Sequence, residues 1–351
     1  MTTSRTTSQT TSLTTPRTPS RALTVHQIAR PDGMPTPADF AFVESPVPVP
    51  GPGTALVENI HLSVDPYMRE AMDGDWALHT PLEGRSIGRV TASRTPGLAV
   101  GDLVFHRHAW RTHALVTPAD VRLLRPVEGV PLRTWLSVLG GTGLTAYVGL
   151  TRTARLQPGE SVFVSAAAGG VGTAVGQFAR LLGAGQVIGS TGTAAKAAHL
   201  VRDIGFDAAF DYHDAPLGEQ LAKAAPDGVD VGFENVGGDH LEGLIANMRP
   251  HGRIAWCGAV AQYNGGAAPA APRNLYDLVH RSVRLEGFLV RDHRDVQREL
   301  EDFAVPHLRS GRLVPDETVV EGIGNVVDAF LAVLRGGNTG KMIVQVGDAG
   351  E

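Results

Sequence analysis

The chain has 351 residues and a formal net charge of −5, from 31 basic and 36 acidic residues. Because its body contains no block of basic residues, nucleic acid and an anionic membrane are not expected as partners. Its one cysteine, Cys257, excludes an internal disulfide and a four-cysteine zinc site and fits a reducing cytoplasm. No apolar run approaches the length of a membrane-spanning helix, and the chain is long enough for two domains.

The first part of the chain predicts a compact β domain. Residues 1–20 are rich in Thr, Ser, Arg and Pro, lack an acidic residue, and are interpreted as a disordered tail, the alternative being a misassigned start. Strands are expected over 22–29, as a pair over 54–64, and over 84–93 and 101–116, with an extended proline-rich connector at 46–52. Many short strands before any strong helix are typical of a small β-rich domain.

From about Trp135 the pattern becomes helical, and from Ser161 strands and helices alternate. Strands are expected at 161–165, 186–191, 208–212, 228–236, 252–258 and 284–290, with helices at 194–203, 217–225, 239–248 and 295–309. This alternation predicts an α/β fold with a doubly wound parallel sheet of the Rossmann type. After Gly311 a strand, a helix closed by Gly336 and a final strand return to the earlier pattern, so this segment is expected to rejoin the β domain.

The stretch from Ser161 to Gly183 has the plan of a dinucleotide site. A short apolar strand leads into a turn of small residues, and an amphipathic helix follows. Small side chains let the backbone approach a pyrophosphate, and the helix N-terminus directs free N–H groups at it. The alternative is an ordinary strand–helix turn. The predicted cofactor-binding residues here are Ala166, in place of the usual first glycine, Gly169, Gly170, Val171 and Gly172.

The end of the second strand favours NADPH over NADH. An NAD site places an acidic residue there to bind the ribose 2′-hydroxyl. This chain instead has Gly192, Thr193 and Lys196, which suit a 2′-phosphate. Lys196 is one of only three lysines, although a solvated helix charge is the alternative interpretation. Tyr212, at the end of the third strand, is expected to contact the adenosine, or else to be a half-buried surface residue.

Loops at the carboxyl ends of the later strands are expected to hold the nicotinamide. The candidates are Asn235, Cys257, Phe288 and Val290. No metal site is expected. His106, His108 and His113 form the densest histidine group, but in a strand the first two share one face and lack Cys or carboxylate partners, so they are interpreted as exposed strand histidines. A serine hydrolase is not supported, because no G-x-S-x-G motif is present.

Six segments together carry a resemblance to a known family. They are VDPYMR (64–69), GLTAY (143–147), AAAGGVG (166–172), FENVGG (233–238), CGAVAQYN (257–264) and NTGKMIV (338–344). In this order and spacing they resemble the zinc-independent prostaglandin reductase / 2-alkenal reductase branch of the medium-chain dehydrogenase/reductase superfamily, from about Ala22 to Val346. Zinc-dependent members carry a G-H-E segment, whereas this chain reads LEGRSIG at 82–88.

The resemblance implies a GroES-like catalytic domain made of residues 21–137 and 311–351, around a Rossmann domain at 138–310. It implies NADPH, with Lys196, Tyr212 and Asn338 at cofactor contacts. It also implies a homodimer formed through the edge of the Rossmann sheet at 284–290. The chain departs from the family pattern near Gly185, where one residue is inserted, at Trp256, and in a small-residue loop after Tyr263.

The implied reaction is reduction of a carbon–carbon double bond conjugated to a carbonyl. Hydride reaches the β carbon, and the resulting enolate needs a hydrogen-bond donor when no metal is present. A neutral phenol suits this task. Tyr263 is favoured as donor and Tyr67 as cleft wall, while the alternative is that both pack and a ribose hydroxyl donates. A quinone reductase and a non-catalytic NADPH-binding protein stay open as other functions.

Overall fold

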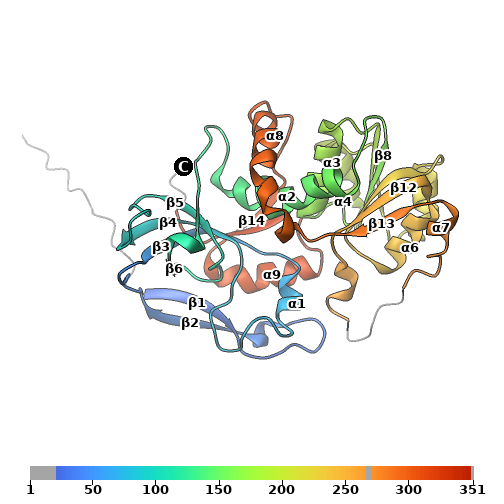
Figure 1. Cartoon of the computed structure of the whole chain (residues 1–351). Coiled ribbons are helices and arrows are strands. Elements are labelled where there is room, and N and C mark those ends of the chain that lie inside the picture. Colours follow the sequence, from blue (N-terminus) through green and yellow to red (C-terminus); the bar gives the residue numbers. More distant parts are fainter. Residues whose placement is uncertain (1–20, 266–270, 349–351) are drawn as a thin grey trace, which may run out of the picture.

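The computed structural model describes residues 21–265 and 271–348, so the expected tail at 1–20 and part of the loop after Tyr263 lie outside the described residues. The chain folds around two large sheets (Figure 1). The green-to-orange middle of the chain forms one, and the blue N-terminal and red C-terminal segments share the other. In the part of the chain that the structure describes, no helix is long and apolar enough to cross a membrane.

The middle of the chain forms a six-stranded parallel sheet in the order β10-β9-β8-β11-β12-β13. The strands are β8 (Ser161–Val164), β9 (Gln186–Thr191), β10 (Ala208–Asp211), β11 (Val229–Glu234), β12 (Met248–Trp256) and β13 (Arg284–Gly287). This is the Rossmann order, and the predicted doubly wound sheet is confirmed. The strand order reverses between β8 and β11, which is where open α/β sheets bind ligands.

Helices cover both faces of this sheet because their apolar sides match its buried faces. They are α2 (Gly141–Val148), α3 (Gly170–Leu181), α4 (Ala194–His199), α5 (Leu217–Ala224), α6 (Gly238–Ala246), α7 (Asp277–His280) and α8 (Gln297–Arg309), with π-helical turns at Gly149–Thr153 and Leu200–Ile204. In α3, Val175, Phe178 and Ala179 are fully buried. Burial of a side chain the size of Val175 or Phe178 contributes about 2 kcal/mol, which holds the N-terminus of α3 beside β8.

The second sheet joins the two ends of the chain, in the order β14-β15-β3-β4-β5-β7 with β6 paired to β3. Its strands are β3 (Ala55–Ser63), β4 (Ser86–Ser93), β5 (Leu103–His106), β6 (His113–Val116), β7 (Arg122–Leu123), β14 (Glu317–Glu321) and β15 (Lys341–Gln345). The predicted return of the C-terminal segment is confirmed. The expected strand pair at 54–64 is wrong: β3 is one continuous strand, buried on both faces and paired with β4, β6 and β15.

A small hairpin and two helices complete the β-rich part. β1 (Arg21–Gln27) pairs with β2 (Phe40–Pro46), a strand that was not predicted from the sequence. The helices α1 (Met68–Ala71) and α9 (Val326–Leu334) pack against the sheet that joins the two ends of the chain. In its core Phe40 stacks on Trp110 at a centroid distance of 5.9 Å, and Phe330 meets both rings edge to face at 5.7 and 6.2 Å. Short helical turns lie at Pro37–Asp39, Pro118–Asp120, Leu132–Leu136, Val260–Gln262, Val290–Val296 and Ile323–Asn325.

The histidines near β5 are not exposed, which corrects the interpretation from the sequence. His106 is 1% exposed and His113 is 5% exposed, because β5 pairs with β4, β6 pairs with β3, and neighbouring side chains cover both strands. Burial lowers the pKa of His106 to about 3, so its ring is neutral at pH 7. His108 is half-buried beside it. Over residues 21–265 and 271–348, no group of three or more His, Cys, Asp or Glu side chains is arranged to hold a metal ion.

Candidate active site

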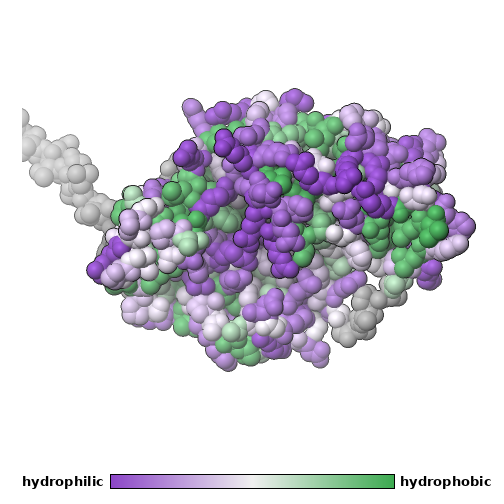
Figure 2. All heavy atoms as spheres, in the orientation of Figure 1, coloured by the Kyte–Doolittle hydropathy of each residue, from purple (hydrophilic) through white to green (hydrophobic). Residues whose placement is uncertain are grey.

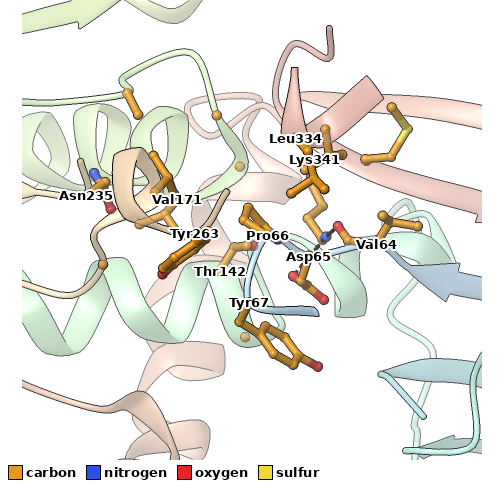
Figure 3. A pocket seen from close by; sticks show the side chains of 18 of the residues that line it. Val64, Asp65, Pro66, Tyr67, Thr142, Val171, Asn235, Tyr263, Leu334 and Lys341 are labelled. Carbon is orange, nitrogen blue, oxygen red and sulfur yellow. Dashed lines mark hydrogen bonds and ion pairs between the residues drawn. The ribbon is translucent and has the colours of Figure 1, made fainter. Parts of the chain in front are cut away.

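One large cavity lies where the two sheets meet, with a volume of about 1550 Å³. Pockets for single small ligands usually measure about 300–1000 Å³, so this one has room for two molecules side by side. Both sheets contribute to its wall (Figure 3). Every site residue predicted from the sequence lines it: Tyr67, Ala166, Gly169, Gly170, Val171, Gly172, Gly192, Thr193, Lys196, Tyr212, Asn235, Cys257, Tyr263, Phe288, Val290 and Asn338.

The turn between β8 and α3 is closely packed on its own backbone. A Cβ atom on Gly172 would lie 2.5 Å from the Ala166 oxygen and from the Ala167 Cα, so no larger residue fits there. Ala166 has φ of 48°, a left-handed conformation that glycine adopts more easily. The first turn of α3 opens into the cavity with backbone amides free for an acceptor. This cradle fits the pyrophosphate of a dinucleotide.

The end of the cavity beyond β9 and β10 is free of acidic side chains. Among the described lining residues the acids are Asp65, Glu70, Asp75 and Glu83, all in the N-terminal part of the chain. Lys196 lies at the β9 end instead, where its ammonium donates to the carbonyl oxygens of Gly336 at 2.5 Å and of Asn338 at 2.6 Å. A cation without a nearby acid suits an anionic group of a nucleotide.

Tyr212 and a histidine that the sequence did not single out form an aromatic wall at this end. The rings of Tyr212 and His240 meet edge to face, with centroids 4.7 Å apart. Burial lowers the pKa of His240 to about 4, and its Nε2 is buried without a hydrogen-bond partner. A neutral imidazole with one free nitrogen is suited to a polar heterocycle such as adenine. No sequence pattern marks His240, because it lies on α6, far along the chain from Tyr212.

The loop after β11 is fixed by a buried carboxylate. Glu234 accepts hydrogen bonds from the amides of Val236 and Gly237, each at 2.7 Å. Burial raises the pKa of Glu234 to about 7, against the effect of these donors. Asn235 donates to the Ser165 carbonyl at 2.7 Å and accepts from the Cys257 thiol at 3.0 Å. Burial, with Glu234 nearby, raises the pKa of this thiol, so Cys257 is a neutral structural group rather than a nucleophile.

The two candidate tyrosines come from different parts of the chain. In Figure 3, Tyr263 lies near Val171 and Asn235, whereas the Tyr67 ring points away from them. The Tyr263 hydroxyl lies against Gly258, and burial together with the neighbouring Glu70 carboxylate raises its pKa to about 12. The Tyr67 hydroxyl is buried without a hydrogen-bond partner, and burial raises its pKa as well. Both phenols are therefore protonated and able to donate at neutral pH.

A buried ion pair that the sequence did not reveal supports this wall (Figure 3). The Lys341 ammonium on β15 donates to the Val64 carbonyl and to the Asp65 carboxylate, the latter at 3.0 Å. Arg85 lies 3.3 Å from the other Asp65 oxygen, and its guanidinium is 5.4 Å from the centroid of the Tyr67 ring. Burial would raise the pKa of Asp65, but Lys341 and Arg85 lower it to about 2. The only signal in the sequence was the scarcity of lysine in an arginine-rich chain.

Comparisons with known proteins agree with this geometry. Residues 24–124 match the model of the N-terminal domain of oxidoreductase, and residues 170–305 match that of zinc-binding dehydrogenase. A 2-alkenal reductase (NADP(+)-dependent) of Nicotiana tabacum is 37% identical over 84% of this chain and 88% of its own. Prostaglandin reductase 1 of Rattus norvegicus is 37% identical over 90% of this chain and 96% of its own.

A solved structure has the same overall fold as this chain. The crystal structure of CurA in complex with NADPH, from Vibrio vulnificus, superposes with a TM-score of 0.87, at 31% identity over 93% of this chain and 99% of that one. Likeness of sequence and fold thus extends over both sheets and over the cavity between them. The chain therefore belongs to the prostaglandin reductase / 2-alkenal reductase branch of the medium-chain dehydrogenase/reductase superfamily.

Proposed function

We propose that this protein reduces the carbon–carbon double bond of α,β-unsaturated aldehydes and ketones with NADPH. The observation that carries the proposal is that a dinucleotide cradle and two protonated phenols line one cavity large enough for two ligands. Its relatives named as NADP-dependent 2-alkenal reductase, curcumin reductase and prostaglandin reductase support C=C reduction rather than quinone reduction.

When bound, NADPH would supply a hydride for transfer to the β carbon of the substrate. The Asn235 loop and the backbone at Cys257, Phe288 and Val290 line the cavity and would hold and orient the nicotinamide. The electron pair of the double bond moves to the carbonyl oxygen, and the Tyr263 hydroxyl donates a hydrogen bond to that oxygen. Tyr67 closes the cleft, and a proton from water reaches the α carbon.

We further propose that the reaction needs no metal and takes place in the cytoplasm. The segment at 82–88 has no G-H-E ligand motif, and the described residues offer no grouped ligand set. Protonated phenols can donate hydrogen bonds to the enolate oxygen, which gives the stabilisation that a metal ion would otherwise provide. A single cysteine fits a reducing compartment.

We also propose a homodimer formed through β13. This strand is at the edge of the parallel sheet, where its backbone groups lack a neighbour in the described chain. Beside it, Tyr276 and Val279 on and before α7 are each 67% exposed. Figure 2 shows an apolar patch at this end of the molecule. Pairing of two β13 edges would cover both the edge and the patch.

The proposed activity is tested by following NADPH oxidation with a series of medium-chain 2-alkenals and enones, and identifying the products by mass spectrometry. We expect saturated aldehydes and ketones, with quinones turned over more slowly. Tight NADPH binding without turnover of any enone would instead favour a non-catalytic NADPH-binding protein. Quinone turnover without enone saturation would favour the quinone reductase.

Lys196→Ala is expected to raise the KM for NADPH by about tenfold to hundredfold, since a hydrogen bond to a charged group is worth about 1.5–3 kcal/mol. The KM for NADH should change little, because NADH has no 2′-phosphate. Steady-state kinetics with both cofactors measures the difference. The exposed Lys223 on α5 provides the control, as Lys223→Ala removes the same charge away from the cavity. Equal effects of Lys196→Ala on both cofactors would contradict the assignment.

A further inference from the structure

Glu234, the last residue of β11, is a buried acid that costs folding free energy where it stands. The residue is fully buried, and its Oε2 atom has no hydrogen-bond partner. Among the described residues, the groups that stabilise its charge are two backbone amides and the Ser165 hydroxyl, and none of them is a cation. A buried acid without a cation is unfavourable compared with an apolar side chain of similar size. Its presence therefore indicates a role other than stability.

The side chain of Glu234 fixes the turn that follows β11. Its Oε1 atom accepts from the amides of Val236 and Gly237, each at 2.7 Å. Gly237 has a φ of 80°, in the left-handed region, and glycine is free to adopt other conformations, so these bonds select one geometry for the turn. The amide of Asn235 is held beside them by the Ser165 hydroxyl at 2.8 Å. A carboxyl oxygen accepts hydrogen bonds in both charge states, so the turn is held whether Glu234 is ionised or protonated.

Two backbone hydrogen bonds fasten this turn to the loop that contains Tyr263. The loop follows β12 and includes the helical turn Val260–Gln262, which lies just before Tyr263. The carbonyl oxygens of Asn235 and Val236 accept from the amides of the first two residues of this helical turn, at 3.0 and 3.2 Å. A chain of hydrogen bonds therefore runs from the Glu234 side chain to the backbone beside Tyr263.

The two segments also pack directly on each other. A Cβ atom on Gly237 would lie 3.1 Å from the Gln262 Nε2 atom. A Cβ atom on Gly258 would lie 3.4 Å from the Asn235 carbonyl oxygen and 3.5 Å from the Tyr263 hydroxyl. Figure 3 shows Asn235 and Tyr263 at the same part of the pocket. A change in the turn after β11 would therefore move the phenol as well.

We propose that Glu234 is a positioning residue for Tyr263, and that it holds the phenol hydroxyl where the enolate oxygen forms by fixing the turn at 235–237 and, through it, the loop at 257–263. This inference rests on the proposed function for the role of Tyr263. Asn235 and Val236 line the cavity, whereas Glu234 lies behind them and acts only through the backbone of its neighbours.

Two substitutions separate the hydrogen bonds of Glu234 from its bulk. Glu234→Met removes both acceptor oxygens and keeps a side chain of similar length, whereas Glu234→Gln keeps one acceptor oxygen. Glu234→Met should lower kcat for a medium-chain enone by about tenfold to hundredfold, because a displacement of about 1 Å at a reacting group has an effect of this size. The KM for NADPH should stay within about threefold, since the cradle and Lys196 are unchanged. Glu234→Gln should keep kcat within about fivefold of the wild type. Glu219→Met, at an exposed position of α5 away from the cavity, is the control and should have no effect.

A double-mutant cycle with Tyr263→Phe distinguishes positioning of the phenol from a general structural effect. If Glu234 acts through the Tyr263 hydroxyl, Glu234→Met should lower kcat of the Tyr263→Phe variant by no more than about threefold. Titration calorimetry with NADPH gives the fraction of each preparation that binds cofactor, and kcat is calculated per binding-competent chain. Equal losses of kcat in the two backgrounds would overturn the proposal, and so would a kcat of Glu234→Gln as low as that of Glu234→Met.

Amide hydrogen exchange followed by mass spectrometry separates this inference from the proposed reaction, because it needs no turnover. In Glu234→Met, peptides that cover 235–237 and 257–263 should exchange about tenfold faster than in the wild type, while peptides from β8 and α3 keep their rates. Unchanged exchange at 257–263 would overturn the proposal. Faster exchange at 257–263 in the variant, together with a wild-type protein that reduces no enone, would overturn the proposed function alone.

Discussion

Tyr263→Phe is expected to lower kcat for enone reduction by about a hundredfold to a thousandfold, the usual cost of removing one donor from an oxyanion site. The hydroxyl lies beside Gly258, on the loop that follows β12, close to the proposed nicotinamide wall. Phenylalanine keeps the ring and its packing, so the KM for NADPH should stay within about twofold. Steady-state kinetics with a medium-chain enone measures both values.

Two other tyrosines serve as comparisons. Tyr67→Phe should lower kcat by about tenfold at most, because Tyr67 is proposed to close the cleft rather than to donate to the developing enolate. Tyr276→Phe, on a side chain that is 67% exposed and away from the cavity, should have no effect. If Tyr67→Phe causes the larger loss, the two residues exchange roles. If neither variant loses tenfold, a ribose hydroxyl or water stabilises the enolate.

The pH profile adds an independent readout for the same residue. The pKa of Tyr263 is raised to about 12, so its hydroxyl remains a donor throughout the neutral and mildly alkaline range. A loss of kcat through deprotonation of this phenol should begin only well above pH 9 in the wild type and be absent from Tyr263→Phe. An alkaline loss near pH 8 that disappears in Tyr263→Phe would contradict this environment.

The cofactor side of the cavity was predictable because its signals are local. A buried strand, a turn of small residues and a helix follow one another within Ser161–Gly183, and the residue types near Lys196 predict a preference for NADPH. Each later strand of a parallel sheet ends at the same edge, so the sequence alone was enough to place Asn235, Cys257 and Phe288 together.

The substrate side was less predictable because its contacts join distant segments. Lys341 meets Asp65 across the pairing of β15 with β3, and no local pattern reports that a lysine near the C-terminus is buried against it. Strand alternation predicted an exposed His106, but β5 is covered on that face and His106 is 1% exposed.

Lys341→Met is expected to lower the free energy of unfolding by about 3 kcal/mol, the typical cost of removing one partner of a buried ion pair. The side chain of Lys341 is only 4% exposed, and Asp65 has 7% of its side chain exposed, so water cannot replace the lost ammonium. Arg85, at 3.3 Å, would compensate for part of the charge. Because the pKa of Asp65 is lowered, the contribution of its charged form is present above pH 4 and is lost as the pH falls through about 2, so urea unfolding at pH 7 measures it in full.

Two further variants separate the ion pair from other effects of the substitution. Lys223→Met, on an exposed lysine of α5, should change the free energy of unfolding by no more than about 0.5 kcal/mol. The double variant Lys341→Met with Asp65→Asn removes both charges and should recover at least half of the loss, because no uncompensated carboxylate remains buried. Lys341 also donates to the Val64 carbonyl, and Asp65 accepts from the Ser63 hydroxyl. A double variant that is less stable than Lys341→Met would show that the pair acts through these hydrogen bonds rather than through its charge. In that case the geometry of the segment before Tyr67, and not its electrostatics, would hold this wall of the cavity in place.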